Sequence, residues 1–227
     1  MKLLPPAVER VFFAVIRPMV DWLIRTGVRP NTLTTIGTLF VLVSAVAYGF
    51  GGIRLGGLLL LLSGVVDTLD GQVARRTDQA TKFGAFYDST LDRVGDGATF
   101  IGIASFLLVA PDVAWRIPAV IVCMVAILAS LLVSYARARA EGLGLECKVG
   151  IAQRAERIVG LGGASLLVGA GPHALVLEVI VALLALASVI TVVQRFLYVH
   201  KITNGALAPN PGGAADRPAL DTLAKGH

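Results

Sequence analysis

The chain has 227 residues, a length that fits one domain, and it carries a net charge of +5. Hydrophobic residues make up 56% of it and charged residues only 15%, whereas soluble domains carry about 25% charged residues, so the composition excludes an ordinary soluble domain and indicates a bilayer protein. Two cysteines, Cys123 and Cys147, are too few for a disulfide framework.

Residues 8–26 have the pattern of an amphipathic helix. Charged side chains recur there at helical spacing among apolar ones, at Arg10, Arg17, Asp21 and Arg25. Such a segment lies in the membrane interface rather than crossing it. Pro18 is expected to divide it into two short helices, because proline interrupts the helical hydrogen bonds.

Six long apolar stretches follow, each close to the ~20 residues that cross a bilayer. They cover residues 31–50, 55–76, 83–110, 115–140, 153–170 and 174–199. Asn31, directly after Pro30, is expected to cap the first. We therefore predict an all-α integral membrane domain over residues 1–202, with six transmembrane helices after an N-terminal interfacial helix. Residues 203–227, rich in Ala, Pro, Gly and Asp, are predicted to form a disordered cytoplasmic tail.

The basic residues predict the orientation of the spans. Of the twenty Lys and Arg residues, only Arg54 and Arg116 fall on the side opposite the N-terminus. The positive-inside rule makes the other side cytoplasmic, which predicts a multi-pass protein of the cell (inner) membrane. Because topology accounts for the positive charge, we expect no nucleic-acid partner.

Four carboxylates lie inside predicted spans. Asp67 and Asp70 are three residues apart in the second span, and Asp88 and Asp92 are four apart in the third, so each pair projects from one helix face. Ionisable residues within a membrane cost at least a few kcal/mol, at about 2.5–3.5 kcal/mol each on insertion scales, which implies a function.

An antiparallel hairpin of these two spans would bring the four acids together. Asp67 would then lie level with Asp92, and Asp70 with Asp88. Such a cluster needs cations to offset its repulsion, and ligands that are all oxygen suit Mg²⁺, Mn²⁺ or Ca²⁺. Two ions about 4 Å apart are the arrangement used for phosphoryl chemistry, with an active site in the cytoplasmic half of the membrane.

Small residues and one arginine accompany the acids. Gly71 and Ala74 follow Asp70, and Gly84 lies one turn before Asp88. Missing side chains let a large ligand approach the backbone. Arg75 supplies a fixed cation for a phosphate oxygen.

The whole pattern resembles the signature of the CDP-alcohol phosphatidyltransferase family. It reads Asp67-x-x-Asp70-Gly71-x-x-Ala74-Arg75, then eight residues, then Gly84-x-x-x-Asp88-x-x-x-Asp92. All eight motif positions match, and the resemblance covers roughly residues 8–200. It implies an enzyme that transfers a phosphatidyl group from CDP-diacylglycerol to an alcohol, in phospholipid biosynthesis, and commonly a homodimer.

The resemblance also implies roles for individual residues. The metal ligands would be Asp67, Asp70, Asp88 and Asp92, holding two Mg²⁺ or Mn²⁺ ions, and Asp92 would also be the general base. The CDP-lipid would contact Asn31, Thr32, Leu33, Thr34, Gly71, Ala74, Arg75, Thr81 and Gly84.

Three further arginines, Arg137, Arg154 and Arg195, come from three helix ends on the predicted cytoplasmic side. Arginine suits phosphate, so these residues predict a small phosphorylated alcohol as the acceptor, although topology alone would also place arginines there. The segments around them resemble bacterial phosphatidylinositol phosphate synthases, which implies inositol 1-phosphate. Arg137 replaces their usual Lys, and Gln153-Arg154-Ala155 their usual Glu-Arg-Pro. Glycerol 3-phosphate is the alternative acceptor.

Other features have simpler interpretations. Asp96 extends the face of Asp88 and Asp92 by a turn, and it could support the metal ligands or pair with Arg93 or another basic group. We interpret it as structural because four acids suffice for two ions. Gly162 and Gly163 are expected to permit close helix packing. A membrane transporter is an alternative of a different class, but transporters place their acids near the bilayer midplane on broken helices.

Overall fold

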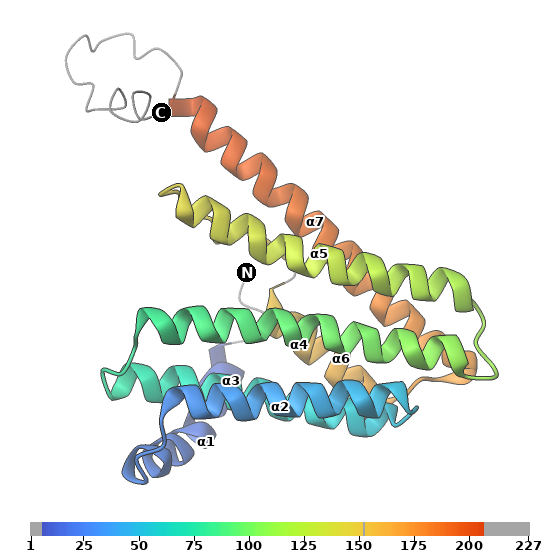
Figure 1. Cartoon of the computed structure of the whole chain (residues 1–227), viewed down its shortest axis with the longest axis horizontal. Coiled ribbons are helices and arrows are strands. Elements are labelled where there is room, and N and C mark those ends of the chain that lie inside the picture. The colour runs from blue at the N-terminus through green and yellow to red at the C-terminus, as the bar shows by residue number, and fades with distance from the viewer. Residues whose placement is uncertain (1–5, 152, 207–227) are drawn as a thin grey trace.

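The computed structural model describes residues 6–151 and 153–206, and the regular secondary structure of these residues is entirely helical. Seven α-helices are present there: α1 (Pro6–Arg25), α2 (Pro30–Gly49), α3 (Ile53–Arg76), α4 (Lys82–Val109), α5 (Arg116–Gly142), α6 (Arg154–Leu167) and α7 (Leu175–Ala206). A 3-10 turn, η1 (Pro172–Ala174), precedes α7 (Figure 1).

Helices α2 to α7 correspond to the six predicted apolar stretches. Three described helices are long and apolar enough to cross a bilayer, namely Pro30–Gly49, Arg116–Gly142 and Pro172–Asn204. Helix α6 has 14 residues, fewer than predicted, so it spans only about 21 Å at ~1.5 Å per residue. Helix α7 continues to Ala206, past the predicted start of the tail at residue 203, and residues 207–227 lie outside the described part.

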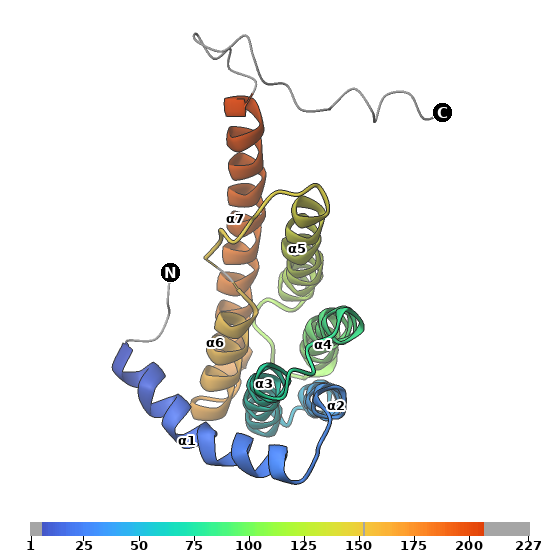
Figure 2. The same cartoon turned by 90° about the vertical axis from the view of Figure 1, so that its left-hand side faces the viewer.

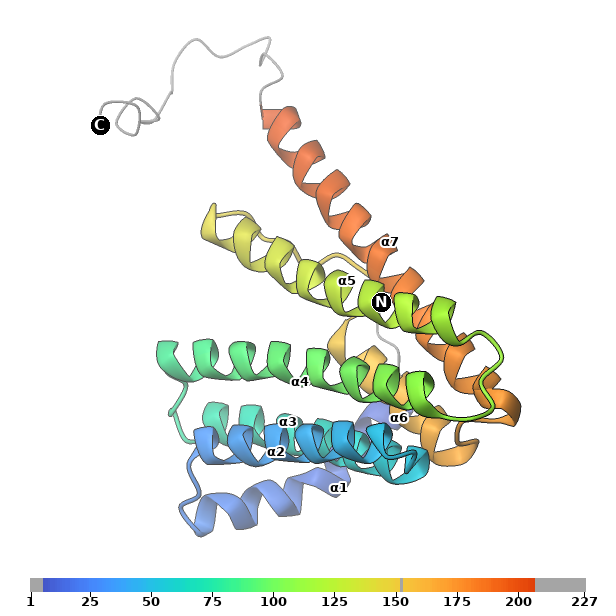
Figure 3. The ribbon, with the colours of Figure 1, turned by 45° about the vertical axis from the view of Figure 1, so that its right-hand side comes forward.

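The helices are arranged around α2 and α4. Helix α2 packs on both α3 and α4, whereas α3 and α4 do not pack along each other as the predicted hairpin requires. Helix α4 lies between the α2–α3 pair and the α5–α7 pair (Figures 1 and 3). Helix α6 packs against α3. Side chains of α2 and α6 contact the acids of α3 and α4.

Helix α1 crosses below the ends of α2 and α3 (Figure 2). It is continuous through Pro18, so the predicted division into two helices is wrong. Ile16 and Val20, on either side of Pro18, are both buried in one apolar cluster with Leu69 and Val73 of α3. This burial offsets the hydrogen bond that proline removes.

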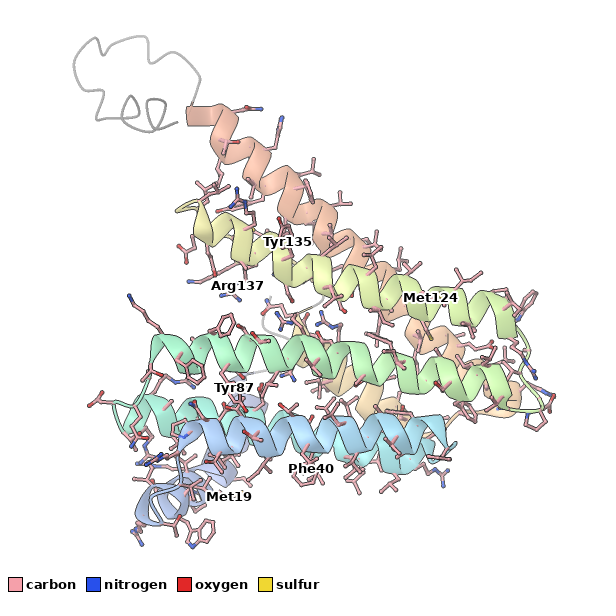
Figure 4. All side chains as sticks on the ribbon, in the orientation of Figure 1. Met19, Phe40, Tyr87, Met124, Tyr135 and Arg137 are labelled. Atoms are coloured by element: carbon pink, nitrogen blue, oxygen red, sulfur yellow. The ribbon has the colours of Figure 1, made fainter. Side chains whose placement is uncertain are left out.

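The main apolar core lies in the half of the bundle away from the acids. It joins residues of α2 to α7, among them Tyr48, Ile103 and Leu177, which are fully buried. Large apolar side chains are also exposed on the outside, including Met124 (62% exposed) and Tyr135 (64% exposed) on α5 (Figure 4). An apolar exterior of this extent suits a protein surrounded by lipid.

Glycines permit close approach at two helix pairs. A Cβ on Gly102 of α4 would overlap the carbonyl of Ala45 in α2. A Cβ on Gly162 of α6 would lie 2.8 Å from Leu61 of α3, which confirms the packing role predicted for Gly162. A Cβ on Gly163 would meet no described atom within 4 Å, so that prediction is wrong for Gly163.

Candidate active site

Three of the four predicted metal ligands converge. Asp67 and Asp70 lie in the last turns of α3, and Asp88 lies in the second turn of α4. One carboxylate oxygen of each comes within 4.8 Å of the others. The spacing of the acids along the two helices therefore brings them together, although the helices do not pack along each other.

Thr34 of α2 holds one of these acids in place. Its hydroxyl donates to Asp70 Oδ2 at 2.6 Å, and both side chains are buried. The same hydroxyl lies 3.2 Å from the Pro30 carbonyl oxygen. Thr34, which the resemblance predicts to contact the nucleotide, thus holds a predicted metal ligand, as hydrogen-bond partners orient carboxylates in metal sites.

The acid cluster fits a divalent ion. Asp88 Oδ1 is a buried oxygen with no hydrogen-bond partner among the described residues. A buried carboxylate oxygen without a partner is costly unless a cation or donor reaches it. The ligands are all carboxylate oxygens, as Mg²⁺ and Mn²⁺ prefer.

The fourth predicted ligand, Asp92, makes different contacts. Its Oδ1 lies 3.0 Å from Arg154 Nη1 at the start of α6, and its Oδ2 lies 3.3 Å from Arg93 Nη2. The same Arg154 nitrogen lies 3.1 Å from Asp67 Oδ2. Arg154 therefore joins an acid of α3 to an acid of α4.

A buried ion pair lies one turn further along α4. Asp96 Oδ2 accepts from Arg157 Nη2 at 2.5 Å, with both side chains buried, and Asp96 Oδ1 lies 3.7 Å from Arg154 Nε. The structural interpretation of Asp96 fits these contacts. Losing one partner of a buried pair is strongly destabilising, so this pair fixes α6 against α4.

A cavity of about 180 Å³ adjoins the acids, between α2, α3 and α4. Its lining includes seven of the nine predicted CDP-lipid residues, namely Asn31, Thr34, Gly71, Ala74, Arg75, Thr81 and Gly84, together with the acids Asp70 and Asp88. Thr81 caps α4 by accepting a hydrogen bond from the Gly84 amide at 2.9 Å. The two glycines keep the cavity open, since a Cβ on Gly84 would lie 3.2 Å from Asn31 Oδ1.

The other two predicted CDP-lipid residues do not line this cavity. Leu33 is buried in the apolar cluster that joins α1 to α3, and Thr32 is exposed. The predicted cap is also wrong, because α2 begins at Pro30, with Arg29 at the cap position. Proline suits the first helical position. Because α2 begins at Pro30, Asn31 lies inside the helix and lines the cavity instead of capping the helix.

The three arginines predicted to bind acceptor phosphate have separate partners. Arg137 is half exposed and pairs with Glu141 at 2.8 Å on the same helix. Arg195 is buried and donates to the backbone carbonyls of Val149, at 2.9 Å, and Val133. Arg195 therefore connects α7 to α5 and to the loop before α6. Of the three arginines, Arg154 is the one that pairs with acids of the site, Asp67 and Asp92.

Arg93, Arg157 and Gln79 belong to the site but were not among the predicted site residues. Arg157 lies three residues after Arg154, so the two share one helix face, and this spacing could have indicated Arg157 as a site residue. Gln79 lines the cavity from the centre of the α3–α4 connection. The sequence suggests Arg93 only as a partner of Asp96, but it lies beside Asp92 instead, because its neighbours depend on how α4 is rotated.

Comparisons with known proteins find similar proteins that match most of the chain. The family model described as CDP-alcohol phosphatidyltransferase matches residues 28–200. The chain is 39% identical to the archaetidylinositol phosphate synthase of Methanothermobacter thermautotrophicus, over 83% of this chain and 92% of that protein. It is 40% identical to the phosphatidylinositol phosphate synthase of Cutibacterium acnes, over 82% and 93% respectively.

Solved structures of a related synthase share the fold. The phosphatidylinositol phosphate synthase of Mycobacterium tuberculosis, in complex with manganese and citrate, superposes with a TM-score of 0.71 at 34% identity, covering 89% of this chain and 92% of that one. The same protein with CDP-DAG bound gives a TM-score of 0.70 at 34% identity, covering 89% and 98%.

Proposed function

Because the chain belongs to the CDP-alcohol phosphatidyltransferase family, we propose that it transfers the phosphatidyl group of CDP-diacylglycerol to inositol 1-phosphate and releases CMP. One observation carries the proposal: the cavity lined by the family's motif residues opens directly onto the acids Asp70 and Asp88. The bound manganese and CDP-DAG of the related synthase support the same assignment of metal and lipid substrate.

The residues of the site have distinct tasks in this reaction. Asp67, Asp70, Asp88 and Asp92 would hold two divalent ions, which when bound neutralise the pyrophosphate and the charge on departing CMP. Arg75 and the glycine-lined cavity would position the CDP group. The acceptor oxygen attacks the lipid-side phosphorus, its proton passes to Asp92, and the bond to CMP breaks with the electron pair leaving on CMP.

The choice of acceptor rests on the relatives and on the basic residues. The two similar proteins above are named for inositol phosphate lipids. Arg154 lies beside Asp92, where an acceptor phosphate would be within reach of its guanidinium. The roles of Arg137 and Arg195 in phosphate binding stay predictions, and glycerol 3-phosphate is the second candidate.

We also propose the membrane arrangement. Helices α2 to α7 would be the six spans, with α1 in the interface and the acids near the cytoplasmic side. Three helices are long and apolar enough for a span, and α3 and α4 are comparably long but carry the acids. The short α6 would be surrounded partly by protein, since it packs on α3. A homodimer in the cell membrane stays a prediction from the resemblance.

An acceptor panel tests the proposed function. Purified protein in lipid nanodiscs would receive CDP-diacylglycerol, Mn²⁺ and, separately, inositol 1-phosphate, glycerol 3-phosphate or unphosphorylated inositol. We expect the highest kcat/KM with inositol 1-phosphate and the corresponding lipid in the mass spectrum. A preference for glycerol 3-phosphate would select the second candidate. A protein that releases no CMP with any alcohol would fit the transporter alternative.

A further inference from the structure

Arg154 contacts two of the predicted metal ligands with a single nitrogen. Its Nη1 lies 3.1 Å from Asp67 Oδ2 and 3.0 Å from Asp92 Oδ1. The Arg154 side chain is only 17% exposed, so these contacts are shielded from solvent. Partly buried charge pairs are screened little by salt, which makes this guanidinium a strong local cation.

The four acids therefore fall into two groups. Oxygens of Asp67, Asp70 and Asp88 gather within 4.8 Å of one another. Asp92 lies outside that group, and each of its two oxygens is already approached by an arginine, Arg154 at 3.0 Å and Arg93 at 3.3 Å. A divalent ion bound by Asp67 and Asp92 would have to take the place of the Arg154 nitrogen between them.

We propose that Arg154 competes with the second metal ion for Asp67 and Asp92, and that binding of this ion frees Arg154 to hold the acceptor phosphate. This inference rests on the two-ion site of the proposed function. The first ion, at Asp67, Asp70 and Asp88, does not require Arg154 to leave Asp92. The two positions therefore differ in affinity before any substrate binds.

The surroundings of Arg154 keep it at the site after displacement. Asp96 Oδ1 lies 3.7 Å from Arg154 Nε, a different nitrogen from the one that contacts Asp67 and Asp92. Asp96 is itself fixed by Arg157 at 2.5 Å. The start of α6 is fixed as well, because Glu156 Oε2 accepts a hydrogen bond from the backbone N–H of Gln153 at 2.8 Å. The guanidinium can thus change partners without its helix moving.

This arrangement couples metal binding to acceptor binding. If the second ion releases Arg154, the ion raises the affinity for the acceptor phosphate, and the phosphate must raise the affinity for the ion by the same factor. The enzyme would then complete its metal site only as its substrates arrive. An alcohol without phosphate could not draw Arg154 away from the acids.

The experiment measures Mn²⁺ binding by electron paramagnetic resonance, with the full chain in nanodiscs and no substrate present. We expect the wild type to bind one ion tightly and a second more weakly. Arg154→Gln should bind the second ion at least about fivefold more tightly, in the range typical of coupled sites, and the first ion little changed. The control is Arg76→Gln, which removes the same charge from the end of α3, where Arg76 pairs with Asp21. It should leave both affinities as in the wild type.

A second variant tests the proposal if Arg154→Gln does not fold. Arg154→Lys keeps the charge but loses the planar guanidinium, so it should also raise the affinity for the second ion, to a smaller degree. If either variant keeps its thermal unfolding transition and binds the second ion no more tightly than the wild type, the competition does not exist. If the wild type binds no Mn²⁺ at all, the proposed metal site fails, and this inference fails with it.

Discussion

At the scale of the residue, the acids of the site have different surroundings. Asp70 and Asp88 border the cavity, and Asp70 is held by Thr34. Asp92 lies beside arginines, with its side chain 16% exposed. A carboxylate at the edge of the acid cluster, next to the arginine proposed to bind the acceptor phosphate, is suited to accept the proton of an incoming hydroxyl.

Asp92→Asn tests this role. The amide has the same shape but cannot accept the proton, so turnover should fall by about 10²–10⁴-fold, the usual contribution of a general base. Binding of CDP-diacylglycerol to the variant, measured by isothermal titration, serves as the control for an intact site. Turnover close to the wild type would show that another group takes the proton.

The sequence predicted the identity of the acids but not all of their partners. Helical spacing alone places Asp67 and Asp70 on one face of their helix, and Asp88 and Asp92 on one face of the next. The distances confirm that Asp67, Asp70 and Asp88 meet, whereas Asp92 lies outside their cluster. The contact of Arg154 with Asp67 could not be predicted, because the two residues are far apart in sequence and meet only through the packing of α6 on α3.

At the scale of the element, apolar stretches predict where helices begin and end but not how they pack. The predicted spans match helices α2 to α5 within about two residues at each end, a normal uncertainty for helix boundaries. The predictions are wrong where tertiary contacts determine the backbone conformation. Helix α1 is continuous through Pro18 because its neighbours Ile16 and Val20 are buried against α3. Likewise, α2 rather than α4 is the main partner of α3.

The contact between α2 and α4 depends on Gly102. A Cβ there would overlap the Ala45 carbonyl, so Gly102→Ala should lower the free energy of unfolding by about 1–3 kcal/mol, as overpacking does. Gly97→Ala, on the same helix, is the matched control, because its Cβ would meet no described atom within 4 Å. Thermal unfolding in nanodiscs would compare the two. Equal stabilities would mean that α2 and α4 are not in close contact at Gly102.

At the scale of the whole molecule, the fold separates an apolar half from a polar half. The main core joins six helices in one half, and the acids, the cavity and Arg154 lie in the other. The distribution of the basic residues predicts which end faces the cytoplasm, because only Arg54 and Arg116 belong to the opposite end.

Labelling of introduced cysteines tests this orientation. Asp112→Cys lies in the connection between α4 and α5, and Glu146→Cys in the connection between α5 and α6, and both positions are exposed. The native Cys123 and Cys147 are buried, which limits background labelling. A membrane-impermeant maleimide should label Asp112→Cys in intact cells and Glu146→Cys only after the cells are opened. The reverse pattern would invert the topology.

We propose that the acids and the adjoining cavity form a metal-dependent phosphatidyl transfer site. The most direct measurement follows CMP and phosphatidylinositol phosphate together in nanodiscs supplied with CDP-diacylglycerol and inositol 1-phosphate. We expect both products to form in equal amounts, excess chelator to abolish both, and Mg²⁺ or Mn²⁺ to restore them. Undiminished formation of both products in protein shown to be free of metal would contradict the proposal.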